Sequence, residues 1–122
     1  MNIQTKEKAL RYFRDSLVSY LLVSERTCSS KQLTTTLVEV EPQEFQRLHS
    51  HVPEQMYFML SGNGEMTVSG ETCMVNEGDS IFIPSNEKHG LMNTGNTKLR
   101  YLSAAAPSFE IDTLNELWPN RS

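Results

Sequence analysis

The chain has 122 residues and a mass of 13.9 kDa, the size of one domain that can bury a core without disulfide or metal staples. Eleven basic against fifteen acidic residues give a formal net charge of −4, and no run of Lys or Arg forms a basic stripe, so nucleic-acid binding is disfavoured. The longest apolar run, residues 20–23, is far too short to span a bilayer, so we expect no membrane partner.

The cellular setting is indicated by the N-terminal segment and by the cysteines. Residues 1–8 carry acid as well as base and contain no apolar stretch, unlike a secretory signal. Cys28 and Cys73 are too few for a disulfide framework and form no Cys-x-x-Cys pair. We therefore expect a cytoplasmic protein with a single domain over residues 1–122, in which both cysteines are small buried or half-buried side chains.

The N-terminal part differs in pattern from the rest of the chain. Residues 4–14 are charged and mildly amphipathic, and we expect a short helix or an ordered arm there. The chain then becomes a series of short runs rich in Leu, Val, Thr and Tyr, broken by Gly, Asn and Pro, which is typical of strands. The strands expected cover residues 16–24, 32–40, 47–51, 55–60, 65–68, 72–75, 80–84, 89–92 and 98–104. Turns are expected between them, including residues 61–64 and a hairpin at Ser69-Gly70.

Strands that recur at this spacing predict an all-β sandwich or barrel, with a barrel core over about residues 16–106. Near the C-terminus, Ile111, Leu114, Leu117 and Trp118 recur at helical spacing. This pattern predicts one closing helix, at about residues 109–118, that packs on the outside of the barrel.

All three histidines fall where one metal ion could bind them. His49 and His51 stand two residues apart in an expected strand, so both imidazoles project from the same face. His89 follows the expected strand at residues 80–84 after a turn. Because neutral imidazole is the commonest protein ligand for borderline divalent metals, the arrangement indicates a metal site.

The second half of this pattern resembles a motif of the cupin superfamily, G-x5-P-x-G-x2-H-x3-N. Gly78, Pro84, His89 and Asn93 match it at each interval, and Asn86 stands where the motif has its middle glycine. This exchange is mild, because Asn tolerates positive φ better than any residue except Gly.

The first cupin motif, G-x5-H-x-H-x3/4-E-x6-G, is matched by His49, His51 and Gly62. Its opening glycine falls near Gln43, and its glutamate ligand falls on Gln55. The two motifs span residues 43–93, and together they make the resemblance a specific one.

Gln55 is the departure that bears on chemistry. If the strand stays regular, odd-numbered residues from 47 to 59 share one face, which puts Gln55 rather than Glu54 beside the histidines. Pro53 favours a bulge or break that weakens this parity argument. A glutamine oxygen is neutral, so the metal should bind less tightly than with Glu and act as a stronger Lewis acid toward anionic substrates. Alternatively, three histidines bind the metal and Gln55 only hydrogen-bonds a metal-bound water. Some cupins that act on sugar acids use Gln at this position.

Other side chains near the motifs each have two interpretations. Arg47 could receive a substrate carboxylate at the barrel mouth or be a solvated rim residue. Tyr57 and Tyr101 could line the pocket as catalytic hydrogen-bond donors or acids, or be core aromatics. Glu54 is either a surface residue or the missing carboxylate ligand.

The resemblance implies an all-β double-stranded β-helix, the jelly-roll or cupin barrel, with one divalent ion, Fe, Mn, Ni, Zn or Cu, and a homodimer. It implies His49, His51, Gln55 and His89 as ligands. The first functional hypothesis is an isomerase or lyase that acts on a small polar acid or sugar derivative by Lewis-acid catalysis. The second is a metal-dependent dioxygenase, and the third is a non-catalytic module that binds a small ligand or senses the metal.

Overall fold

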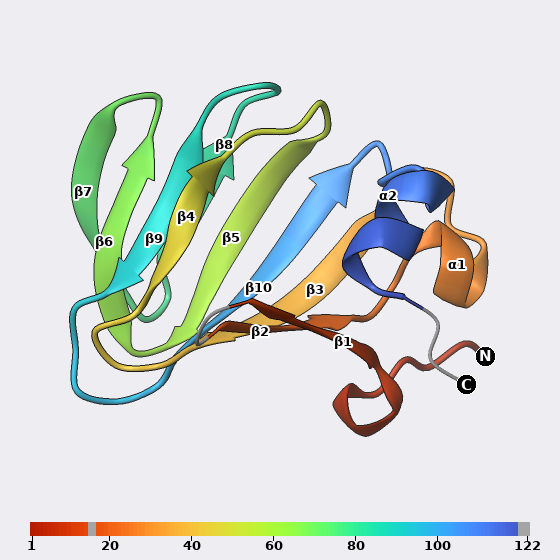
Figure 1. Cartoon of the computed structure of the whole chain (residues 1–122), viewed down its shortest axis with the longest axis horizontal. Helices are drawn as coiled ribbons and strands as arrows, with labels where there is room; N and C mark the ends of the chain where they lie inside the picture. Colours follow the sequence, from red (N-terminus) through yellow and green to blue (C-terminus); the bar gives the residue numbers. More distant parts are fainter. Residues whose placement is uncertain (15–16, 120–122) are drawn as a thin grey trace.

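The computed structural model describes residues 1–14 and 17–119 (Figure 1). Ser16, where a strand was expected to begin, lies outside the described residues. The strands are β1 (Leu10–Arg14), β2 (Leu17–Leu21), β3 (Thr34–Val40), β4 (Phe45–His49), β5 (Glu54–Ser61), β6 (Asn63–Val68), β7 (Glu71–Asn76), β8 (Ser80–Ile83), β9 (His89–Asn93) and β10 (Leu99–Ala106). The helices are a 3-10 turn at Lys6–Lys8, α1 (Glu25–Cys28) and α2 (Ile111–Leu117).

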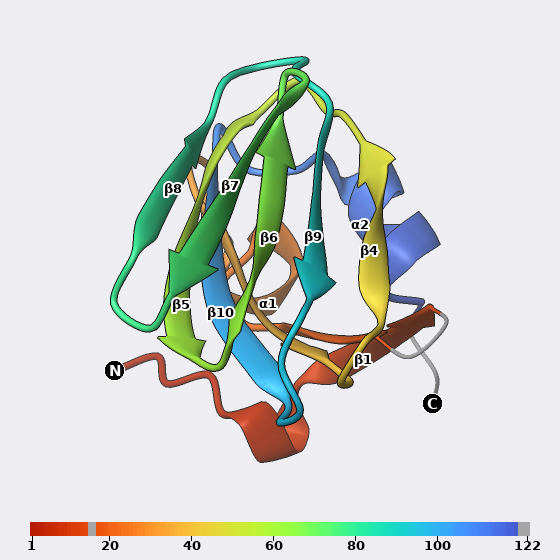
Figure 2. The same cartoon turned by 90° about the vertical axis from the view of Figure 1, so that its left-hand side faces the viewer.

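The strands form two antiparallel sheets that face each other, which confirms the expected jelly roll (Figure 2). One sheet has six strands in the order β1-β2-β3-β10-β5-β8, and the other has four in the order β4-β9-β6-β7. Alternate residues of β2, β5 and β10 are buried between the sheets, as the period of two requires. The buried cluster there comprises Leu17, Val38, Val40, Tyr57, Met59, Met66, Val75, Ile83, Leu91, Leu99 and Tyr101.

Gly62 is the corner at which the chain leaves one sheet for the other. It is the single residue between the end of β5 and the start of β6, and its φ is +83°. The turn expected at residues 61–64 is therefore one residue long, and the flanking residues belong to the strands. A Cβ added there would lie 2.9 Å from the backbone Cα of Leu99. Only glycine therefore fits both the left-handed conformation and the close approach of β10.

The N-terminal segment is an ordered arm whose helical part is limited to the 3-10 turn at Lys6–Lys8, and most of the rest is strand β1. After the turn at Lys6–Lys8, β1 pairs with β2 in the register Leu10↔Leu21 and Tyr12↔Ser19. The apolar positions Leu10 and Tyr12 are two residues apart and pack against the same cluster, so the period of the segment is that of a strand.

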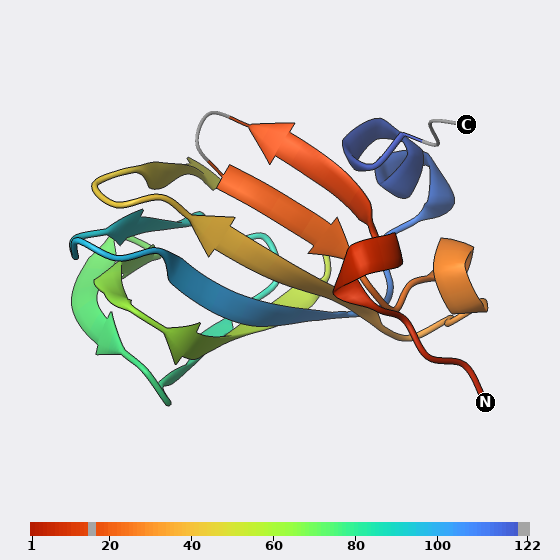
Figure 3. The same ribbon diagram turned by 90° about the horizontal axis from the view of Figure 1, so that it is seen from below.

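Helix α2 confirms the predicted C-terminal helix and closes one end of the sandwich. Leu114 is fully buried, in a second cluster with Leu21, Ala105, Phe109 and Trp118. Viewed from below, α2 lies beside α1 at the end of the molecule opposite β6 and β7 (Figure 3). The short helix α1 was not expected from the sequence, and Ser24 caps it by accepting a hydrogen bond from the Thr27 amide.

Among the described residues no helix is both long and apolar enough to cross a membrane. Both cysteines are free thiols; Cys28 is half-buried, as expected. Cys73 is exposed, so the prediction of a buried or half-buried side chain is wrong there. The cause is that β7 is the edge strand of its sheet and turns most of its side chains to solvent.

Candidate metal centre

The three histidines converge from strands β4 and β9 and from the segment between β4 and β5. His49 ends β4 and pairs directly with His89 at the start of β9, and His51 lies in the segment that leads to β5. One ligand atom from each ring lies within 4.8 Å of the others. The ring centroids of His49 and His89 are 4.2 Å apart, and those of His51 and His89 are 4.9 Å apart.

Each of these rings makes the same hydrogen bond to the backbone. The Nδ1 contacts are His49 to Arg47 O at 2.9 Å, His51 to Pro53 O at 2.9 Å and His89 to Glu87 O at 3.0 Å. A carbonyl oxygen only accepts, so Nδ1 carries the proton in every ring and the neutral ring keeps its lone pair on Nε2. A hydrogen bond from the other ring nitrogen to a carbonyl is the usual support of a histidine that binds a metal.

His89 supplies the clearest sign that the site fits a metal ion. Its side chain is fully buried, and Nε2 has no hydrogen-bond partner among the described residues. Burial, together with the nearby His49 and His51, lowers the pKa of His89 to about 4, although its bond to Glu87 acts in the opposite direction. Burial also lowers the pKa of His49. Both rings are therefore neutral near pH 7, which is the form that binds a metal.

Gln55 lies beside this cluster on β5 and is buried, whereas its neighbour Glu54 is exposed. Gln55 Oε1 is 2.8 Å from His51 Nε2, and Gln55 Nε2 donates to Ser103 Oγ at 3.0 Å. Since Nε2 of neutral His51 has no proton, two acceptor atoms face each other. A positive charge at Nε2, a proton or a metal ion, makes that contact favourable, so the donor set fits a divalent ion.

Strand β4 departs from the regular alternation expected of it. Its register with β9 shifts between Gln46, which pairs with Leu91, and His49, which pairs with His89. Three residue steps along β4 therefore correspond to two along β9, which is a β-bulge. Such a bulge turns Gln46 and His49 to the same side, and Arg47 becomes an exposed residue at the rim. The regular parity expected from residue 47 onward is therefore wrong in β4, while in β5 Gln55, Tyr57 and Met59 all point inward.

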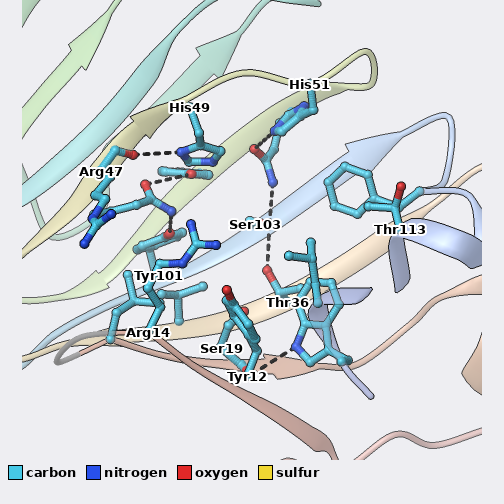
Figure 4. Close-up of a pocket in the computed structure, with 18 of the residues that line it drawn as sticks. Tyr12, Arg14, Ser19, Thr36, Arg47, His49, His51, Tyr101, Ser103 and Thr113 are labelled. Atoms are coloured by element: carbon cyan, nitrogen blue, oxygen red, sulfur yellow. Dashed lines mark hydrogen bonds between the residues drawn. The ribbon is translucent and has the colours of Figure 1, made fainter. Parts of the chain in front are cut away.

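His49 and His51 line a cavity of about 320 Å³ between the sheets (Figure 4). Figure 4 shows His49 and His51 on one side of it, with Arg47 and Arg14 at one end and Thr113 at the other. The remaining lining residues are Tyr12, Leu17, Ser19, Thr36, Val38, Phe45, Gln46, Ser50, Gln55, Tyr57, Tyr101, Ser103, Phe109, Glu116, Leu117 and Trp118.

Tyr57 and Tyr101 are both cavity residues and core residues. They are stacked with centroids 4.1 Å apart, and each is 1% exposed. Tyr57 donates to Gln46 Oε1 at 3.1 Å, and Gln46 Nε2 donates to the Tyr101 hydroxyl at 3.0 Å. Burial raises the pKa of Tyr57 to about 12 and that of Tyr101 well above its usual value, so both hydroxyls keep their protons near neutral pH.

Several lining residues carried no signal in the sequence. Arg14 comes from β1, and its charge contributes to lowering the pKa of His49. Phe109 stacks edge-on to His51 with centroids 5.2 Å apart, and Trp118 closes the wall from the end of α2. These residues lie near the two ends of the chain, so only the folded structure brings them to the histidines. Gln46 was missed because the bulge reverses its side of the strand.

Comparison with known proteins places this geometry in context. Residues 36–105 match the family model described as the cupin domain. An uncharacterized protein of Methanocaldococcus jannaschii is 38% identical over 63 residues, which are 51% of this chain and 50% of that protein. The oxalate-binding protein of Thermotoga maritima is 31% identical over 83 residues, 67% of this chain and 69% of that one.

Among solved structures, an RmlC-like cupin from Shewanella frigidimarina superposes with a TM-score of 0.76 at 18% identity, over 90% of this chain and 94% of that one. The chain thus spans about half the length of the first relative and nearly the whole of this solved structure.

Proposed function

This chain belongs to the cupin family, and from that premise we propose that it binds one divalent metal ion through His49, His51, His89 and Gln55, and holds a small carboxylate-bearing molecule in the cavity beside them. The buried, unpartnered Nε2 of His89 carries the proposal. Leaving a buried nitrogen lone pair without a partner costs free energy, which a bound cation removes.

The charges around the cavity support an anionic ligand. Arg14 and Arg47 line one end, whereas Glu116 is the one carboxylate among the described lining residues. A divalent ion beside four neutral ligands adds uncompensated positive charge, so the interior attracts an anion although the chain as a whole is acidic. The likeness to an oxalate-binding protein supports a ligand of this chemistry.

For a reaction, we propose isomerase or lyase chemistry on such an acid or a sugar derivative. A bound divalent ion supplies a Lewis acid that polarises a carboxylate or carbonyl oxygen. Tyr57 and Tyr101 keep their protons near neutral pH, so they act on the ligand as hydrogen-bond donors or acids and not as bases. Leu117 and Trp118 at the end of α2 exclude water from that side of the cavity.

One observation favours a second candidate, a module that binds the ligand without turnover. Gln46 accepts from Tyr57 and donates to Tyr101, which ties both buried hydroxyls into one network. With both hydroxyls engaged, the carboxylate nearest to serving as a general acid or base is that of Glu116. It is the one carboxylate among the described lining residues, and it is exposed. A dioxygenase is favoured less, because the commonest class of mononuclear non-haem iron oxygenases binds its iron through two histidines and a carboxylate, and this ligand set has a glutamine instead of the carboxylate.

Metal analysis tests the first part of the proposal. The protein is purified without chelating resin, and its metal content is compared with that of His51→Ala. We expect about one metal ion per chain in the parent and a content near zero in the variant. A parent chain that takes up no divalent metal, or a variant that retains it, would overturn the proposal.

Calorimetric titration with oxalate and with small sugar acids tests the second part. Binding is expected to the metal-loaded protein, and Arg14→Ala should weaken it. Arg11→Ala is the matched control, since Arg11 lies on the same strand but packs over Phe13 outside the cavity lining. Absence of binding by any of these acids to loaded protein would contradict the assigned ligand class, whereas product formation would separate an enzyme from a binding module.

The homodimer and the cytoplasmic location stay predictions. Phe58 and Phe82 alternate with inward-facing residues of β5 and β8, so they extend from the outer face of the six-stranded sheet and expose apolar surface. Size-exclusion chromatography with light scattering measures the molar mass in solution and so checks the predicted homodimer.

A further inference from the structure

A glutamine in a ligand position poses a problem that a glutamate does not. The two ends of a carboxamide differ, because the oxygen can bind a cation and the NH₂ group cannot. Gln55 can serve the proposed metal site only if its oxygen is held toward the histidines. Something at the other end of the amide must therefore accept hydrogen bonds from the nitrogen.

Ser103 on β10 is that acceptor. Its Oγ receives the Gln55 Nε2–H at 3.0 Å and lies 2.8 Å from Oγ1 of Thr36, its direct partner across the β3–β10 ladder. The exposed fractions are 8% for Gln55, 2% for Ser103 and 4% for Thr36. At this burial the serine hydroxyl, rather than solvent, satisfies the amide nitrogen.

We propose that Ser103, supported by Thr36, is a positioning residue that holds the Gln55 carboxamide with its oxygen toward the histidines and so completes the metal site. The proposal rests on the proposed metal-binding function. Without the serine hydroxyl, the ligating orientation leaves a buried N–H unpaired, whereas the reversed amide can donate to the lone pair of His51 Nε2. Loss of Ser103 therefore penalises the metal-bound state more than the metal-free state.

The experiment measures the affinity of the full chain for Co²⁺ by competition with a chromophoric chelator, together with the visible absorption spectrum of bound Co²⁺. Ser103→Ala should weaken binding about tenfold, the scale found when the supporting partner of a metal ligand is removed. Its Co²⁺ spectrum should shift toward that of Gln55→Ala, because the oxygen ligand is lost in both. Thr36→Val, which keeps the side-chain shape, should shift both readouts in the same direction by less.

Repeating the Ser103→Ala exchange in the Gln55→Glu variant separates a positioning role of Ser103 from a general disturbance of the structure. A carboxylate has oxygen at both ends, so Gln55→Glu needs no orientation. In that background Ser103→Ala should change Co²⁺ affinity by no more than about threefold. Ser19→Ala is the matched control, a buried serine of the same cavity whose contact with Trp118 is through its backbone carbonyl. It should leave affinity and spectrum unchanged.

The outcomes distinguish this inference from the proposed function. A parent chain that does not bind Co²⁺, or that binds it as tightly in His51→Ala, overturns the metal site and the positioning role with it. If the parent binds Co²⁺ through the histidines but Ser103→Ala binds as tightly, only the positioning role is overturned. An equal loss on Ser103→Ala in the parent chain and in the Gln55→Glu background overturns it as well.

Discussion

Gln55 Oε1 lies 2.8 Å from Nε2 of His51, so two atoms that carry lone pairs face each other inside the barrel. The His51 ring holds its proton on Nδ1, which donates to Pro53 O at 2.9 Å. Only a positive charge at Nε2 turns this contact from repulsion into attraction. The pair therefore has the geometry of two side chains that share a cation.

Gln55→Glu should tighten divalent metal binding by about tenfold, since a carboxylate adds a full negative charge next to the ion. Competition titration with a chromophoric chelator measures the change. Glu54→Gln is the control, because the adjacent Glu54 is exposed on the other face of β5 and its loss should leave the affinity unaltered. Equal affinity in Gln55→Glu and the parent chain would place Gln55 outside the ligand set.

The parts of the fold that follow from local pattern could be predicted from the sequence. The strands from β3 to β10 and helix α2 follow from alternating or helical apolar positions and from turn residues such as Gly62. Tertiary pairing decides the rest. The bulge in β4 depends on its register with β9, which no local pattern in residues 45–49 reveals. Segment 10–14 is a strand because β2 pairs with it.

The candidate site divides in the same way. His49, His51 and His89 could be found because their spacing is part of a sequence motif. The cavity wall could not, since Arg14 and Trp118 come from opposite ends of the chain and meet only after folding. Such residues leave no spacing pattern to read.

Glu39→Gln should lower stability at neutral pH by about 1 kcal/mol, a modest value because both cationic partners are about half exposed. Glu39 is 6% exposed and contacts Lys6 Nζ at 3.2 Å and Arg100 Nε at 2.8 Å. Burial raises the pKa of this carboxyl, but the hydrogen bonds from Lys6 and Arg100 outweigh it and hold the pKa below its usual value of 4.5.

The sign of the pH dependence follows from that lowered pKa. The charged carboxylate stabilises the fold above the unfolded-state pKa, and this stabilisation is lost as pH falls through the folded-state pKa. Urea unfolding of parent and Glu39→Gln should therefore differ at pH 7, and the two curves should converge in acid as the pH falls below the usual carboxyl pKa of 4.5 and through the lowered folded-state pKa. Glu41→Gln is the control, since Glu41 is 51% exposed and meets Lys98 at 3.6 Å. A gap between parent and Glu39→Gln that widens in acid would contradict the assignment.

Leu114→Ala should cost about 2–4 kcal/mol, because it opens a cavity under α2 where Leu114 is fully buried against Phe109 and Trp118. Since α2 supplies no histidine, Co²⁺ affinity of the folded variant should stay at the parent value. Binding of a carboxylate ligand should weaken, as Trp118 forms part of the cavity wall. Denaturant unfolding and the two titrations measure these effects. Ile111→Ala, on an exposed face of α2, should change stability by less than about 0.5 kcal/mol.

Asn93, the last residue of the second motif, should prove to be a structural residue and not a metal ligand. Its fully buried amide donates to Val40 O at 2.9 Å and Thr97 O at 2.8 Å, while its oxygen accepts from the Gly95 amide at 2.9 Å. Asn93→Ala leaves these backbone groups unpaired and should cost about 2–4 kcal/mol in denaturant unfolding.

The metal affinity of folded Asn93→Ala should equal that of the parent, because its hydrogen bonds connect β9 to β3 and to the turn before β10 rather than to the histidines. The control is Asn96→Ala in the same turn, where the side chain is exposed and no change in stability is expected. Loss of Co²⁺ binding with unfolding free energy intact would reverse the assignment. Asn93 would then be part of the metal site, and its position in the motif would be that of a ligand rather than of a residue whose hydrogen bonds hold β9 to β3.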